Sequence, residues 1–136
     1  MSARSQKKAK DHPLLWVVES LMEEPSYVAK PMFGCLGIYL HGRLMLVLAS
    51  GEEPWNGLLI PTEHQFHDAI VKEFNDVVRH TVLKKWLYLP EATEDFETVA
   101  SDIVDVVRMN DQRFGVEPQE RISSKKKKLI RGKNKA

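Results

Sequence analysis

The sequence predicts an α+β fold, in which an antiparallel sheet of about five strands carries helices packed on it. The expected order is α-β-β-β-α-β-β-α. Runs of β-branched, aromatic and aliphatic residues follow one another through short turns, which favours antiparallel pairing. Apolar residues recur at helical spacing in three other stretches. The 136 residues, 43% of them hydrophobic and 29% charged, suit one globular domain with its own core.

A first helix is expected from about Asp11. Pro13 lies in its first turn, where proline is tolerated, and one face carries apolar residues at helical spacing. The apolar face consists of Leu14, Val17, Val18, Leu21 and Met22. The helix ends at Glu24-Pro25-Ser26, because the residue before a proline is biased away from helical geometry.

Three strands are expected next, over about 27–40, 43–49 and 58–60, the first of them interrupted near Pro31. A two-residue turn at His41-Gly42 joins the first two, because glycine supplies the positive φ that such a turn requires. The first and second strands therefore form a hairpin.

This turn also predicts the register of the hairpin, with Leu40 opposite Arg43 and Ile38 opposite Met45. Both faces of the resulting ribbon are apolar, whereas a sheet wetted on one side alternates apolar and polar residues. The hairpin is therefore covered by protein on both sides, or covered on one side by a partner.

Three glycines belong to this region. Gly34 and Gly37 are expected inside the first strand and Gly42 in the turn, and we assign all three a structural role in turns. A glycine inside a strand indicates a bulge, a bend or a side chain packed over bare backbone.

The second half of the domain predicts a helix over about 63–75, β segments from Val77 to Leu83 and from Lys85 to Leu89, and a last helix from Thr93 to about Met109. Acidic residues stand in the first turn of the last helix, where the helix dipole favours them. Its expected buried face consists of Phe96, Val99, Ala100, Ile103, Val104 and Val107.

Four short motifs carry a family resemblance: Pro31-Met32-Phe33-Gly34, Gly37-Ile38-Tyr39, the turn glycine Gly42, and Leu89-Pro90-Glu91. On these motifs, over about 28–110, the chain resembles the TfoX N-terminal domain family, which is named for a bacterial competence regulator. The resemblance implies a compact regulatory domain of similar fold. The family has no well-defined enzymatic activity, so the resemblance brings no catalytic residue and no cofactor to this chain.

The chain departs from the pattern of this family at two positions. His41 stands before the turn glycine, where family members usually have an acidic or amide residue. Pro61 lies near the place where family members often have a lysine, in the strand after the hairpin. No role of that strand is therefore carried over from the family.

Charge divides the chain into three parts. Residues 1–10 form a basic arm with four Lys/Arg, residues 11–118 an acidic domain with eight Lys/Arg and 18 Asp/Glu, and residues 119–136 a Lys-rich tail with eight Lys/Arg and one acid. We expect the arm and the tail to be disordered, because they offer little to bury. An acidic domain repels phosphate backbones, so contact with nucleic acid would have to come from the arm and tail.

The tail has six cationic residues that are candidates for contact with nucleic acid or an acidic partner. They are Lys125, Lys126, Lys127, Lys128, Arg131 and Lys133. Such contact would depend strongly on salt and would not read sequence. The alternative, which we weigh equally, is a solubilising tail that folds back on its own acidic body.

Few residues suggest chemistry. Cys35 is the only thiol, and the expected register places it opposite Leu48 among apolar residues, where cysteines are usually inert. His64, His67 and Asp68 lie within one helical turn, but His64 and Asp68 are expected to face solvent, and no cysteine nearby completes a metal site.

Three further aromatic residues are given structural roles. His80, in an expected strand, is interpreted as a half-buried structural histidine. Trp16 and Trp55 lie off the main apolar faces and could anchor an interface, although packing against the domain's own core is the preferred interpretation.

These features favour a non-enzymatic interaction or regulatory module that binds another protein or self-associates as a homodimer, with basic tails that contact nucleic acid. We expect no cofactor, no metal and no membrane contact, and a cytoplasmic location in a bacterial cell. The alternative is a small enzyme or ligand-binding domain whose site lies near residues 31–43 and uses Cys35, His41 or the other histidines.

Overall fold

The computed structural model of the chain describes residues 12–117. In this range one six-stranded antiparallel sheet has the order β1-β2-β3-β4-β6-β5. Its strands are β1 (Val28–Met32), β2 (Cys35–Leu40), β3 (Arg43–Ser50), β4 (Asn56–Ile60), β5 (Val78–Arg79) and β6 (Leu87–Pro90). The helical segments are η1 (Leu15–Glu23) and η2 (His64–Phe66), both of the 3₁₀ type, and the α-helices α2 (His67–Glu73) and α3 (Phe96–Arg108). The predicted α+β class is confirmed.

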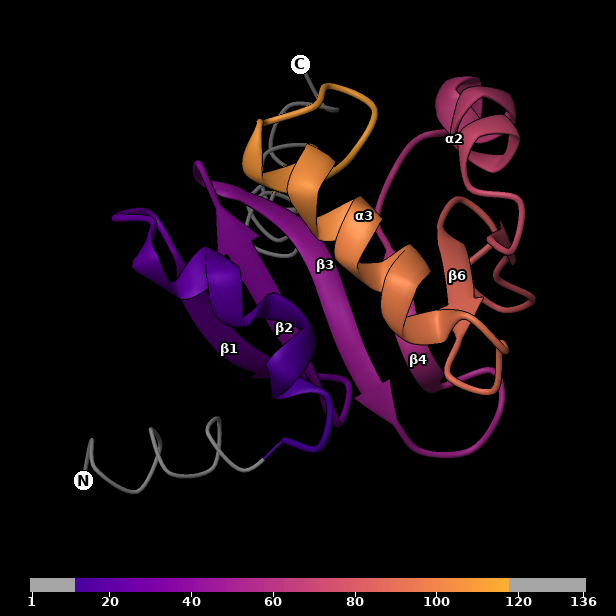
Figure 1. Ribbon diagram of the computed structural model, residues 1–136, viewed down its shortest axis with the longest axis horizontal. Coiled ribbons are helices and arrows are strands. Elements are labelled where there is room, and N and C mark those ends of the chain that lie inside the picture. The colour runs from indigo at the N-terminus through magenta and orange to yellow at the C-terminus, as the bar shows by residue number, and fades with distance from the viewer. Residues whose placement is uncertain (1–11, 118–136) are drawn as a thin grey trace, which may run out of the picture.

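Two of these helical segments cover one face of the sheet. α3 runs diagonally across β3 and β4, and η1 lies beside it over β1 and β2 (Figure 1). α3 buries Phe96, Ala100, Ile103, Val104 and Val107, as its periodicity predicts, whereas Val99 is only half-buried. The main core of the protein lies between this helical layer and the sheet.

The opposite face of the sheet carries a second apolar cluster. Its buried members are Cys35, Leu44, Val47, Ala49, Leu59, Tyr88 and Val116. Trp55, Leu83 and Trp86 pack against this cluster from the loops. These buried members are at most 8% exposed, whereas Met32 and Tyr39, which pack against the same cluster, are half-buried.

The first expected strand is in fact two strands. β1 and β2 are joined by a tight turn at Phe33-Gly34, where both residues have positive φ, and Met32 pairs with Cys35. Pro31 lies inside β1 and does not interrupt it, because β1 is the edge of the sheet and an edge strand tolerates proline. Four strands therefore precede the second helix, and the sheet has six strands where about five were expected.

The register of the β2–β3 hairpin matches the prediction only near the turn. Leu40 pairs with Arg43, but Ile38 pairs with Leu46 instead of Met45. A β-bulge places one extra residue on β3, and the side chains of Met45 and Leu46 both enter the main core. Because the extra residue shifts the later pairs, the predicted register fails beyond the bulge.

The three glycines have different roles. Gly34 and Gly42 occupy turns with φ of 79° and 78°. Gly37 lies within β2, not in a turn, and a Cβ there would come within 2.7 Å of the Met32 sulfur. The side chain of Met32 therefore packs over the bare backbone of Gly37, which is one of the alternatives that the sequence left open.

The segment between α2 and β6 forms less β structure than expected. The predicted strand from Val77 to Leu83 shortens to the two residues of β5. The reason is His80, whose Nδ1 accepts hydrogen bonds from the backbone N–H groups of Val82 and Leu83 at 3.1 and 2.9 Å. Because these N–H groups are bonded to the imidazole, the backbone turns around the ring and does not continue the pairing of β5 with β6.

A short segment after α3 returns to the sheet. Leu44 and Val116 exchange two backbone hydrogen bonds, of 2.9 and 3.0 Å. The guanidinium of Arg43 donates to the carbonyls of Phe114 and Gly115 at 2.6 and 3.1 Å. The described residues therefore end at Glu117, beside β3. Within them, no helix has the length and apolar character that crossing a bilayer requires.

Candidate binding groove between η1 and α3

A groove with a volume of about 510 Å³ lies between η1 and α3. Val17 and Val104, both buried core residues, form its floor. The indole of Trp16 forms one wall. The groove lies on the helical face of the sheet, opposite the face that holds Cys35.

Polar side chains line the rest of this groove. They are Glu19 and Ser20 on η1, and Glu97, Thr98, Ser101 and Asp102 on α3. On α3 the spacing explains the arrangement, since residues four apart stand one above the other on the same side of a helix. On η1 the inward residues Val17, Val18 and Leu21 leave positions 19 and 20 to point outward.

Trp16 is 46% exposed, although its ring meets the ring of Phe96 edge-on, with centroids 6.1 Å apart. The expectation that Trp16 packs into the core is therefore only half correct. Large exposed aromatic side chains are frequent anchors in protein interfaces. Trp55, in contrast, packs against the cluster on the other face of the sheet, as expected.

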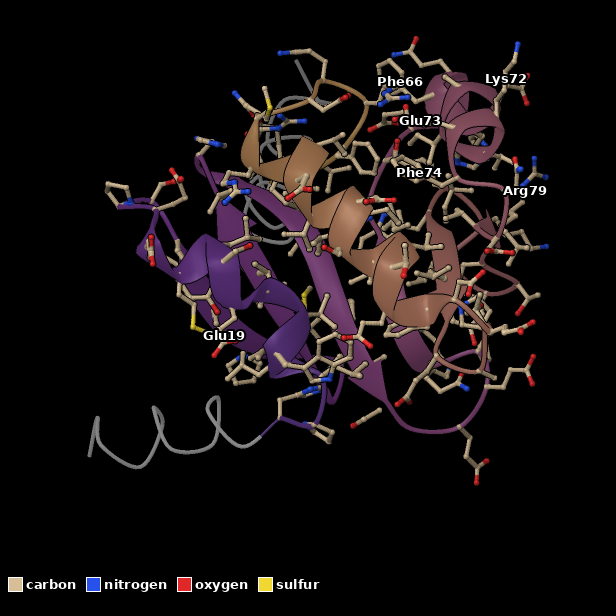
Figure 2. All side chains as sticks on the ribbon, in the orientation of Figure 1. Glu19, Phe66, Lys72, Glu73, Phe74 and Arg79 are labelled. Carbon is tan, nitrogen blue, oxygen red and sulfur yellow. The ribbon has the colours of Figure 1, made fainter. Side chains whose placement is uncertain are left out.

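The three carboxylates of the groove, on Glu19, Glu97 and Asp102, form no ion pair with any residue in 12–117. Glu19 projects outward from η1 (Figure 2). The ion pairs within the described range lie elsewhere, for example between Arg113 and Glu73, at 2.9 Å. The groove therefore presents unneutralised negative charge beside an exposed indole.

This combination suits a cationic side chain with an apolar stem. A Lys or Arg head group is attracted to carboxylates and to the face of an indole, with cation–π energies of about 0.5–1 kcal/mol at exposed sites. Its methylene groups can lie on apolar surface while the charged head stays in water. The hydroxyls of Ser20, Thr98 and Ser101 add hydrogen-bond acceptors along the walls.

Cys35 does not belong to this groove. Its thiol donates to the carbonyl of Phe33 at 3.7 Å, and burial raises the pKa of the thiol. The shifted register pairs Leu36 with Leu48, so the expected position of Cys35 opposite Leu48 is wrong. A buried thiol with a raised pKa carries little of the thiolate needed for nucleophilic chemistry.

The histidines near the start of α2 lie close together. The rings of His64 and His67 are 5.0 Å apart, and His64 and Asp68 are exposed, as expected. His67 is buried, with Nε2 2.8 Å from the carbonyl of Lys85, whereas its buried Nδ1 has no partner. Within residues 12–117, no three His, Cys, Asp or Glu side chains are arranged to hold a metal ion.

His80 is a structural histidine, but it is fully buried where half-burial was expected. Because its Nδ1 accepts two backbone hydrogen bonds, Nε2 carries the proton and donates to the carbonyl of Pro54 at 3.0 Å. The rings of Trp55 and Tyr88 meet the imidazole edge-on at 4.7 and 5.5 Å. Burial lowers the pKa of His80, which favours this neutral form.

The candidate contact residues Lys125, Lys126, Lys127, Lys128, Arg131 and Lys133 lie outside the described residues. Sequence reasoning missed the groove itself, because its walls come from segments far apart in the chain. The available signal was Trp16, an aromatic residue off the apolar face of its helix.

Comparison of the chain with protein-family models, with curated proteins and with solved structures finds no match.

Proposed function

We propose that this protein is a non-enzymatic interaction module that binds a Lys/Arg-rich segment in the groove between η1 and α3. The observation that carries the proposal is the exposed indole of Trp16 beside three carboxylates without ion-pair partners in residues 12–117. The methylene stems of the basic side chains pack on the apolar floor, and their cationic head groups pair with the carboxylates.

Two elements of the sequence interpretation join this proposal. The resemblance to the TfoX N-terminal domain supports a regulatory role in the bacterial cytoplasm. The lysines of the tail, Lys125 to Lys128, supply cationic groups for non-specific contact with nucleic acid, which the acidic domain itself disfavours.

The alternative of an enzyme or ligand-binding site at the hairpin of residues 31–43 has less support. Cys35 is buried among apolar side chains, and burial raises the pKa of its thiol. His41 is exposed in a turn, where its backbone N–H is hydrogen-bonded to the hydroxyl of Ser26 at 2.9 Å.

A peptide titration tests the proposed groove. Pentalysine is added at low salt to a full-length variant in which the lysines Lys125–Lys128 are serine, so that the tail does not compete. The indole N–H signal of Trp16, assigned by comparison with Trp16→Phe, should shift saturably in NMR spectra. Pentaglutamate at the same concentrations should leave it unmoved.

Matched substitutions locate the site. In the serine background, Glu19→Gln, Glu97→Gln and Asp102→Asn together should weaken pentalysine binding about tenfold, since three exposed ion pairs at about 0.5 kcal/mol each amount to about 1.5 kcal/mol. The control carries Glu52→Gln, Asp76→Asn and Glu91→Gln, which remove the same charge from exposed positions outside the groove. Equal weakening in both triple variants contradicts a local site.

A further inference from the structure

We infer that the groove between η1 and α3 is occupied in the intact chain by the chain's own Lys-rich tail, residues 119–136. This inference rests on the proposed function, because it names the segment that the groove binds. The occupant is identified by its charge, by its reach and by the effect of tethering.

Charge complementarity is the first argument. The described residues 12–117 contain eight Lys/Arg and 17 Asp/Glu, whereas residues 119–136 contain eight Lys/Arg and one acid. Three of the acidic residues meet at the groove beside Trp16 without an ion pair in the described range. The tail offers four consecutive lysines, Lys125 to Lys128, whereas the basic arm at residues 1–10 has four Lys/Arg in all, none in a run longer than two.

Reach is the second argument. The last described segment is tied to β3 through Val116 and ends at Glu117. The eleven residues that follow Glu117, up to Lys128, span up to about 36 Å when extended. A domain of about 100 residues has a radius of gyration of about 13 Å. The lysines can therefore reach the helical face from the end of β3 without any change in the domain.

Tethering is the third argument. A segment joined to its binding site by a short stretch of the same chain has an effective concentration of about 1 mM at that site. If an untethered segment binds the groove with a dissociation constant of about 0.1 mM, the tethered tail occupies it about nine-tenths of the time. An external basic peptide then binds about tenfold more weakly than to a free groove, since its affinity falls with the fraction of free sites.

The test compares pentalysine binding to the wild-type chain and to the full-length variant with serine at positions 125–128, followed through the Trp16 indole signal. We expect the wild-type dissociation constant to be about tenfold weaker at low salt. At 0.5 M salt the difference should shrink, because exposed charges are screened. A second variant, with Lys7, Lys8 and Lys10 replaced by serine, should behave like wild type.

The outcomes separate the inference from the proposed function. Equal affinity of pentalysine for both chains overturns the inference and leaves the groove as a binding site for an external partner. Absence of binding to the serine variant overturns both. If the arm variant tightens binding and the tail variant does not, the arm is the occupant and the inference is wrong. If the wild-type constant strengthens on tenfold dilution of the protein, the tail docks on a second copy, which also overturns the inference.

Discussion

The two faces of the sheet differ in whether their polar groups are buried and have partners. On the face that carries Cys35, loops close over the cluster and His80 is fully buried, with both ring nitrogens hydrogen-bonded. On the helical face, the groove between η1 and α3 leaves Trp16 half-exposed and its three carboxylates without ion pairs in the described residues.

We therefore expect the polar groups of the loop-covered face to matter for stability, and those of the groove to matter for binding. A buried polar group that loses its partner destabilises a fold by about 1–3 kcal/mol, so the loops around His80 must keep their arrangement. Exposed carboxylates without partners contribute little to folding and keep their charge for a ligand. Substitutions on the loop-covered face should therefore change the free energy of unfolding, and substitutions in the groove should change binding.

The largest loss of stability is expected from Gly57→Ala. Gly57 is the second residue of β4. An added Cβ would overlap the carbonyl oxygen of Leu89 and come within 2.8 Å of the backbone nitrogen of Glu91. Backbone cannot move aside cheaply, so we expect about 4 kcal/mol of destabilisation in urea denaturation. The control is Gly51→Ala, whose Cβ would meet only ordinary contacts at 3.5 Å or more, and which should cost less than about 1 kcal/mol.

A smaller but substantial loss is expected from His80→Ala. It leaves the N–H groups of Val82 and Leu83 and the carbonyl of Pro54 without their partner and opens a cavity beside Trp55. We expect about 3 kcal/mol of destabilisation. The exposed His64→Ala should change the free energy of unfolding by less than about 0.5 kcal/mol. Similar losses for the two variants would contradict the structural role of His80.

The same buried imidazole predicts a pH dependence. Burial lowers the pKa of His80 below its ordinary value of 6.5, and burial acts on His12 in the same direction. The unfolded chain then takes up protons first as the pH falls, so stability should be constant above pH 6.5 and decrease below it. Asp111, whose pKa is lowered by its hydrogen bonds from Arg113, loses its contribution only as the pH falls below 3.8. Denaturation midpoints at pH 7.5, 6.5 and 5.5 therefore report the histidines, and a flat series would contradict their neutral burial.

The smallest effect on stability is expected in the groove. Glu19→Gln, Glu97→Gln and Asp102→Asn together should change the free energy of unfolding by less than about 1 kcal/mol, because these carboxylates are exposed and have no ion pairs in residues 12–117. The same variant should lose affinity for basic peptide. A large loss of stability would show that the groove carboxylates hold η1 and α3 together, which would remove the distinction between the two faces.

Local patterns predicted the regular elements well. The apolar periodicity of the last helix and the glycine of the His41-Gly42 turn both act through short-range geometry, so the sequence alone was sufficient. The turn at Phe33-Gly34 was missed because a phenylalanine with φ of 52° is unusual, and turn propensities do not favour it.

Features that depend on contacts distant in sequence could not be predicted. The bulge at Met45 is recognisable only once β2 and β3 are paired. β5 ends early because the ring of His80 binds the backbone that follows it. The groove brings together Glu19 and the pair Glu97 and Asp102, which are about 80 residues apart in the sequence, and only the packing of η1 on α3 makes them neighbours.

The central claim is that the groove beside Trp16 binds a basic segment, which in the intact chain is its own tail. Carbodiimide cross-linking of the full-length monomer tests it directly, because this reagent joins a lysine amine to a carboxylate only when the two are in contact. Mass spectrometry should find links from Lys125–Lys128 concentrated on Glu19, Glu97 and Asp102, and lost at 0.5 M salt. Links spread equally over the exposed carboxylates outside the groove, such as Glu52, Asp76 and Glu91, would contradict the claim.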